Sequence, residues 1–248
     1  MTYFFRGIED GMPMTWYGTV HIALLLFWLL GMASIVAYKK HIPKYFKNDL
    51  LLKIFASILL ADQIILYSWQ FGSGYFNWHM SLPLYHCRVG TVLIIIATFS
   101  NNTWAKAVGI YWAILGSLMA MLLPDMYLFK FPHYTNFQFF VVHILLGFMV
   151  MYTIAVQNYC FPKKDLKRVF IFSNIFNICV AAFNICMRPY FPSINYAFMY
   201  EVPPMLKSSL NFPLYIYLPV ILLLYNVITF VIWCVGKRIY ALQKKICK

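Results

Sequence analysis

The sequence is poor in charge, and above all in negative charge. Only 11% of its 248 residues are charged, and seven acidic residues stand against twenty basic ones. A soluble domain of this size carries about 25% charged residues. No polar stretch is long enough to form a second domain. The shortage of charge therefore argues against a soluble protein and predicts a single integral membrane domain over residues 1–248.

Two further absences narrow the class of protein. No CxxC pair occurs, and most cysteines lie in apolar runs, so we expect no disulfide framework. The six cysteines are Cys87, Cys160, Cys179, Cys186, Cys234 and Cys247. The basic residues are scattered in short segments between apolar runs and do not form one patch. We therefore expect contacts with anionic lipid headgroups and no nucleic-acid partner. We expect no cleavable signal peptide in the N-terminal stretch.

Apolar sequence is what the chain has in abundance. Hydrophobic residues make up 62% of it, and seven apolar runs are near the ~20 residues that a spanning helix needs. The runs are 16–38, 50–69, 83–99, 106–123, 138–157, 169–187 and 213–236. This pattern predicts an all-α, polytopic bundle of seven transmembrane helices.

The basic residues between these runs predict the orientation of the bundle. Fifteen of them fall on one side of the membrane, in the first and fifth connections, after the third run and in the C-terminal tail. The other side has four, which are Arg6, Lys130, Arg188 and Lys207. Positively charged loops stay in the cytoplasm, so we expect the N-terminus outside and the C-terminus inside.

Polar residues within the predicted helices gather toward the outer side, and the inner halves look almost entirely apolar. This outer group consists of His21, Asp62, Asp125, His133, His143, Asn177 and Asn184. A polar side chain at membrane depth is costly and usually faces the bundle interior or a watery cavity. A shared depth on several helices predicts one polar chamber that opens outward.

The stretch "SLPLYHCRVG" at residues 81–90 places a histidine and an arginine on either side of Cys87. A reactive cysteine needs a nearby cation or imidazole to stabilise its thiolate. Consecutive helical residues do not face each other, so the base should come from another helix. His143 has the best matching depth, and His21 and His133 are alternatives.

Four segments together resemble a known family. They are "WYGTVH", "LPLYHCRVG", "IYWAILGSLMAMLLPD" and "FPHYTNFQFFVVHILLG", in that order. The series resembles the YwaF-type family of bacterial integral membrane proteins. The family pattern is LPLHLC, a helix rich in tryptophan and glycine that ends in PD, and FPHF followed by FF..H. That family looks similar to the eukaryotic transmembrane-protein-164 acyltransferases, which build polyunsaturated ether phospholipids.

The resemblance implies a multi-pass protein of a bacterial plasma membrane, with membrane phospholipids as substrate and no cofactor. Carried across, the family's catalytic cysteine is Cys87 and its histidine is His143. One position departs from the pattern, because Tyr85 stands where the family has its first histidine and His86 stands where it has leucine. The imidazole is thereby displaced by about 100° around a helix.

Our leading hypothesis from the sequence is acyl transfer through a thioester on Cys87, with His143 as the base. Six residues are candidates for binding the substrate or orienting the catalytic groups, and these are His21, Asp62, Arg88, Asp125, His133 and Asn184. Arg88 or Asn184 would bind a phosphate or orient the carbonyl. Either acid would be the third group that orients the histidine.

Two alternatives remain open at this point. The polar chamber suits a transporter or receptor that binds a small solute or protons without catalysis. His21, His133 and His143 also form a possible metal or haem site, although no HxxxH or HxH spacing occurs.

Overall fold

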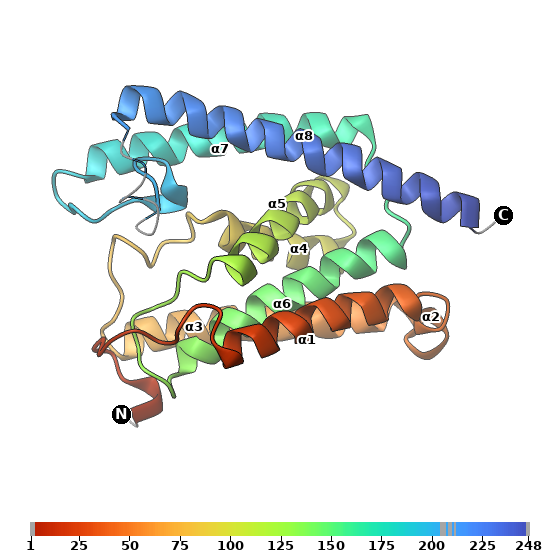
Figure 1. The fold of residues 1–248 in the computed structure, drawn as a ribbon, viewed down its shortest axis with the longest axis horizontal. Coiled ribbons are helices and arrows are strands. Elements are labelled where there is room, and N and C mark those ends of the chain that lie inside the picture. Colours follow the sequence, from red (N-terminus) through yellow and green to blue (C-terminus); the bar gives the residue numbers. More distant parts are fainter. Residues whose placement is uncertain (1–2, 204–206, 208–209, 211, 247–248) are drawn as a thin grey trace. The chain divides into compact units, whose positions relative to one another are not determined.

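The computed structural model describes residues 3–203, 207, 210 and 212–246, and these residues form helices and loops without a strand (Figure 1). The long helices are α1 (Thr19–Ala37), α3 (Leu50–Gly72), α4 (His86–Ser100), α5 (Thr103–Leu122), α6 (Tyr134–Ala155), α7 (Lys163–Met187) and α8 (Leu214–Ile246). The short ones are η1 (Tyr3–Phe5), α2 (Ile42–Tyr45), η2 (Lys47–Asp49) and η3 (Tyr196–Phe198). Each of the seven predicted runs is a helix, so the all-α membrane fold is confirmed.

Six of these helices are long and apolar enough to cross a membrane, and α4 is the exception. Its 15 residues extend about 22 Å, whereas the hydrocarbon core of a bilayer is about 30 Å thick. The predicted run began at residue 83, but the helix begins only at His86. The Leu82 N–H donates to the Tyr196 hydroxyl, and the Ser81 and Leu82 carbonyls accept from Arg88, so the chain before His86 is held as a loop.

The chain divides into two compact units, and each is described here by itself. The first consists of Met1–Phe76 and Gly90–Tyr159, and the second of Asn77–Val89 and Cys160–Lys248. The boundary runs through the first turn of α4. Cys87 therefore belongs to the second unit and His143 to the first, and their pairing stays a prediction.

In the first unit, α6 is the central helix and packs against α1, α3 and α5. Most of its residues are buried, whereas α1 exposes large apolar side chains such as Phe27 and Leu30. A helix that is apolar on its exposed face is suited to lipid contact. The first unit thus has an inner helix surrounded by helices with lipid-facing surfaces.

The close approach of α1 to α6 depends on Gly147. A Cβ atom added there would lie 2.1 Å from Nε1 of Trp28 and 2.9 Å from Oγ of Ser117. We expect Gly147→Ala to lower the free energy of unfolding by about 1–3 kcal/mol, because the buried indole would have to move. Thermal unfolding in detergent measures this, with Gly72→Ala as the control, since a Cβ at Gly72 meets nothing within 4 Å. Equal melting temperatures for the two variants would contradict the packing.

The start of α6 is fixed by a capping box at His133. The Asn136 side chain accepts from the His133 backbone N–H at 2.9 Å, and the Thr135 N–H donates to Nδ1 of His133 at 3.2 Å. The helix consequently begins at Tyr134, four residues earlier than predicted. His143 therefore lies about 13 Å along the helix, deeper than the single turn expected from the sequence.

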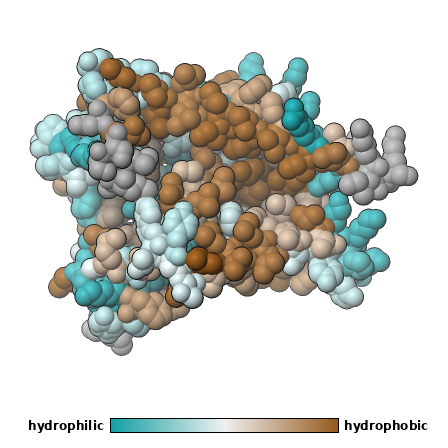
Figure 2. Space-filling model, in the orientation of Figure 1, coloured by the Kyte–Doolittle hydropathy of each residue, from teal (hydrophilic) through white to brown (hydrophobic). Residues whose placement is uncertain are grey.

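In the second unit, α7 packs against α8. Asn174 and Asn226 exchange side-chain hydrogen bonds of 2.8 and 3.0 Å between these helices, so each partly buried amide satisfies the other. The outer face of α8 is mainly hydrophobic in the view of Figure 2. The thiols of Cys160, Cys179, Cys186 and Cys234 are free, and Cys247 lies outside the described residues.

Candidate functional site

The loop that leads into α4 is held by Tyr196, a residue with no exposed surface. Its hydroxyl donates to the carbonyl of Trp78 at 2.9 Å and accepts from the N–H of Leu82 at 3.0 Å. The ring of Tyr85 packs against it, with 5.2 Å between ring centroids. One side chain thus fixes the loop at two backbone positions directly before Cys87.

Asn184 of α7 fixes Tyr196 in turn. Its amide nitrogen donates to the Tyr196 carbonyl at 2.9 Å, and its oxygen accepts from the Tyr196 N–H at 3.0 Å. Both ends of the amide are therefore engaged with backbone. In the structure Asn184 joins η3 to α7, and its expected contact with substrate stays a prediction.

Arg88 holds the same loop from α4. Its Nη1 donates to the carbonyls of Ser81 at 2.8 Å and Leu82 at 3.2 Å, and its guanidinium lies 5.7 Å from the centre of the Tyr85 ring. The structure gives Arg88 a role in shaping the turn before the helix. Its expected contact with a lipid headgroup stays a prediction.

The hydroxyl of Tyr196 offers a test of this loop. We expect Tyr196→Phe to lower the free energy of unfolding by about 1–3 kcal/mol, because the Leu82 N–H loses its acceptor. Tyr190→Phe is the control, since Tyr190 is 76% exposed. Removing its hydroxyl should lower the free energy of unfolding by less than about 0.5 kcal/mol. Thermal unfolding and amide hydrogen exchange at Leu82 give the two readouts. An unchanged exchange rate at Leu82 would refute the role of the hydroxyl.

Cys87 is the second residue of α4 and is half-buried. At the start of a helix the backbone N–H groups lack helical partners and the helix dipole is positive. Both features stabilise a thiolate and an oxyanion. The position therefore suits a nucleophile, and the catalytic role of Cys87 stays a prediction.

The neighbouring His86 is buried and directed at α7 and α8. Its Nε2–H donates to Oδ1 of Asn177 at 2.7 Å, and the Tyr225 hydroxyl lies 3.3 Å from its Nδ1. The rings of His86 and Tyr225 stack with centroids 4.5 Å apart. Both ring nitrogens are thus occupied, so His86 contributes packing and is not the base for Cys87. Sequence reasoning missed Tyr225, because a single tyrosine in an apolar helix is common at membrane depth.

In the first unit, His21 ties the start of α1 to the end of α5. The Tyr17 N–H donates to its Nδ1 at 3.0 Å, and its Nε2–H donates to the Met121 carbonyl at 2.8 Å. The peptide N–H fixes Nδ1 as the acceptor, which leaves no lone pair for a proton. In the structure His21 therefore joins the two helices, and both of its ring nitrogens are engaged.

His133 has the same constraint at the start of α6. Its Nδ1 accepts from the Thr135 N–H, so its Nε2–H donates to the Arg6 carbonyl at 3.0 Å. Burial lowers the pKa of His133, which favours this neutral form. The side chain fixes the N-terminal segment and has no nitrogen left to act as a base.

His143 differs from both. Its Nδ1–H donates to the Phe139 carbonyl at 2.6 Å, which places the remaining lone pair on Nε2. Nε2 is buried and has no hydrogen-bond partner among the described residues. A backbone acceptor on one nitrogen fixes the tautomer and leaves the other nitrogen able to take a proton. Of the three candidates, His143 alone has the arrangement of a general base.

The acids expected to orient His143 do not do so. Asp62 accepts from Gln138 at 3.0 Å and from Gln63 at 3.1 Å through the same oxygen, and Asp125 is exposed in the connection between α5 and α6. The Phe139 carbonyl is the orienting group instead. Asp62 serves a buried link between α3 and α6.

The metal-site alternative also lacks its geometry. Over the residues that the structure describes, no three histidine, cysteine, aspartate or glutamate side chains lie close enough to share an ion. His21, His133 and His143 are each bound to a different backbone carbonyl. The bonds of His21 and His133 hold helix ends in place, and that of His143 lies within α6.

Comparison with known proteins agrees with the membrane fold. No curated protein and no solved structure matches the chain. A model of the TMEM164 family matches residues 16–237, which include both residues and every helix from α1 to most of α8. The chain is thus a multi-pass membrane protein that belongs to the TMEM164 family.

Proposed function

We propose that the protein is a membrane-embedded acyltransferase that moves a fatty acyl chain through a thioester on Cys87. The position of Cys87 at the start of a short helix carries this proposal. Only Asn101 and Asn102 separate α4 from α5, so these two helices meet at one membrane face. Since α4 is about 22 Å long and the hydrocarbon core is about 30 Å thick, α4 begins about 8 Å inside the opposite edge of that core. The ester bonds of an undisturbed phospholipid lie at the edge of the hydrocarbon core, so they would have to approach Cys87 from that edge.

The proposed reaction has two balanced halves. His143 Nε2 takes the thiol proton, and the sulfur of Cys87 attacks the ester carbonyl of the donor lipid. The tetrahedral oxyanion collapses, the lysolipid alkoxide leaves with the proton from His143, and a thioester remains. An acceptor hydroxyl then loses its proton to His143 and attacks the thioester. The new ester forms, and the proton returns to the sulfur.

Two observations support these roles. Backbone N–H groups at the start of α4 are suited to hold the oxyanion, and the loop before Cys87 is fixed by Tyr196 and Arg88. The Nε2 lone pair of His143 is unused within the described structure. The proposal includes three further statements. The thiol of Cys87 lies close to the Nε2 lone pair of His143, the reaction takes place at the outer leaflet, and the membrane is a bacterial plasma membrane.

The reaction itself can be measured with purified protein in lipid nanodiscs. The donor is a phosphatidylcholine with an isotope-labelled acyl chain, and the acceptor is a lysophospholipid with a different headgroup. We expect label in the acceptor's phospholipid product, and none with heat-inactivated protein. Absence of transfer and of any acylated protein, across ester and ether acceptors, would reject the proposed function.

A further inference from the structure

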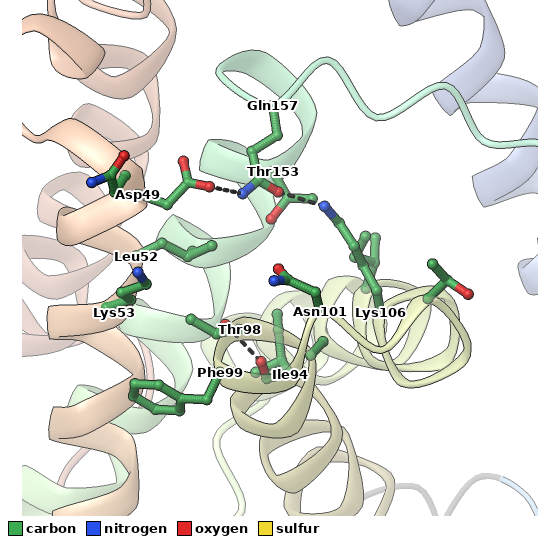
Figure 3. A pocket seen from close by; sticks show the side chains of 14 residues that line it. Asp49, Leu52, Lys53, Ile94, Thr98, Phe99, Asn101, Lys106, Thr153 and Gln157 are labelled. Carbon is green, nitrogen blue, oxygen red and sulfur yellow. Dashed lines mark hydrogen bonds between the residues drawn. The ribbon is translucent and has the colours of Figure 1, made fainter.

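The first unit contains a cavity of about 350 Å³ at the end where α3 and α5 begin and α4 and α6 end (Figure 3). Its wall carries two lysines, one aspartate and several amide and hydroxyl groups. The sequence analysis described the inner halves of the helices as nearly all apolar and did not predict a cavity at this end. The polar residues were missed because the charged ones had been explained as topology signals.

A chain of hydrogen bonds fixes one lysine at this wall. The hydroxyl of Tyr152 and the amide of Gln157 each donate at 2.8 Å to the carboxylate of Asp49, one to each oxygen. Lys106 donates at 2.6 Å to the amide oxygen of Gln157. Figure 3 shows Asp49, Gln157 and Lys106 in a row along the cavity. The carboxylate is thus bound on both oxygens, and the ammonium of Lys106 is held in position.

Lys53 supplies a second cation to the same cavity. It follows Asp49 by one turn of α3 and is half-buried. Within the described structure its ammonium makes no hydrogen bond or ion pair. A half-buried charge without a counter-ion favours binding of an anion. Lys53 and Lys106 together are suited to a phosphate.

Other parts of the wall indicate that the phosphate belongs to a larger, partly apolar molecule. The cavity is within the range of small-molecule sites, about 300–1,000 Å³. Leu52 and Ile94 give it an apolar side, and Phe99, which also lines it, is 51% exposed on the surface of α4. These features suit a glycerol backbone that continues into acyl chains beside α4.

We propose that this cavity binds the phosphate-bearing headgroup of a phospholipid in the leaflet on the lysine-rich side, which is cytoplasmic in the predicted orientation. The site is separate from the proposed catalytic base, because Thr153 of its wall lies about 15 Å along α6 from His143. It holds a lipid that is not the acyl donor at Cys87, and its occupancy is independent of acyl transfer.

The test uses the full-length protein in detergent and dihexanoyl phosphatidic acid as the probe, with the dissociation constant measured by calorimetry. We expect Lys53→Gln to weaken binding about tenfold, because a charge-assisted bond to phosphate is lost. Since Lys53 makes no bond in the described structure, this variant should fold as the parent does. Lys40→Gln, an exposed lysine on the same side outside the cavity, should bind with the parent's affinity.

Two further ligands separate the possible sources of phosphate. Dihexanoyl glycerol, which has no phosphate, should not bind, and inorganic phosphate should bind at least about tenfold more weakly than the lipid. Inorganic phosphate that binds as tightly as the lipid, with the same loss in Lys53→Gln, would overturn the headgroup assignment. Equal lipid affinity in Lys53→Gln, Lys40→Gln and the parent would overturn the site. Neither result bears on Cys87, whose labelling by a thiol probe is measured separately.

Discussion

Replacing Cys87 by alanine is expected to abolish acyl transfer in nanodiscs and to remove the acylated form of the protein. The thioester cannot form without the sulfur, so the loss should be at least about 10³-fold. Cys87→Ser should be nearly as inactive, because a serine hydroxyl is a much weaker nucleophile beside an imidazole. Intact mass spectrometry before and after hydroxylamine shows whether a thioester is present.

Cys179→Ala is the matched control for this experiment. Cys179 is an exposed cysteine of α7, and its replacement should leave the transfer rate within about twofold of the parent. The alternative of a transporter predicts the opposite order of severity, with Cys87→Ala tolerated and Asp62→Asn harmful. A transfer rate in Cys87→Ala that equals that of the parent, in a folded protein, would reject the thioester mechanism.

The second large effect is expected at His143. His143→Gln should reduce acyl transfer by about 10²–10⁴-fold, the contribution of a general base. The side chain has one hydrogen bond, to Phe139 of its own helix, so the variant should keep its fold. Its second readout is the rate at which iodoacetamide alkylates Cys87, which should fall because less thiolate forms.

His21→Gln provides the comparison, because His21 is equally buried but has both nitrogens bound. It should lower the melting temperature while leaving the alkylation rate of Cys87 unchanged. A structural role for His143 would make the two variants alike in both measurements. An alkylation rate that is unaffected by His143→Gln would show that the thiol finds its base elsewhere.

The fold could be predicted from the sequence because a bilayer imposes one dominant constraint. Each spanning segment must be apolar and helical over about 20 residues, and that pattern is local in the sequence. Helix ends were predicted less well, since they depend on particular groups. Side-chain bonds from Tyr196 and Arg88 hold the residues before α4 in a loop, and the capping box at His133 starts α6 four residues early.

The candidate site was predictable in its parts but not in its connections. Cys87 and His143 were proposed from motif and depth, and their pairing stays a prediction. The structure shows that both ring nitrogens of His21 and of His133 are hydrogen-bonded. The contact of Tyr196 with Leu82, by contrast, joins residues 114 positions apart. No periodicity marks such a pair, and a tyrosine in a loop is ordinary at a membrane interface.

The cavity at the lysine-rich end was missed for a related reason. Asp49, Lys53, Lys106 and Gln157 lie in or beside three different connections, and each is unremarkable where it stands. In the folded protein Gln157 bonds to both Asp49 and Lys106, and Lys53 lines the same cavity. Charge near a helix end fixes orientation in the membrane, but the same charge can also line a site.

The short length of α4 has a consequence for the lipid around it. A segment that is about 8 Å too short for the hydrocarbon core must be matched by a locally thinner bilayer or by headgroups and water drawn inward. Either adjustment lowers the polar–apolar boundary toward Cys87. The protein would then bring the ester bonds of neighbouring lipids to its thiol by deforming the membrane, and no lipid would have to leave the bilayer to react.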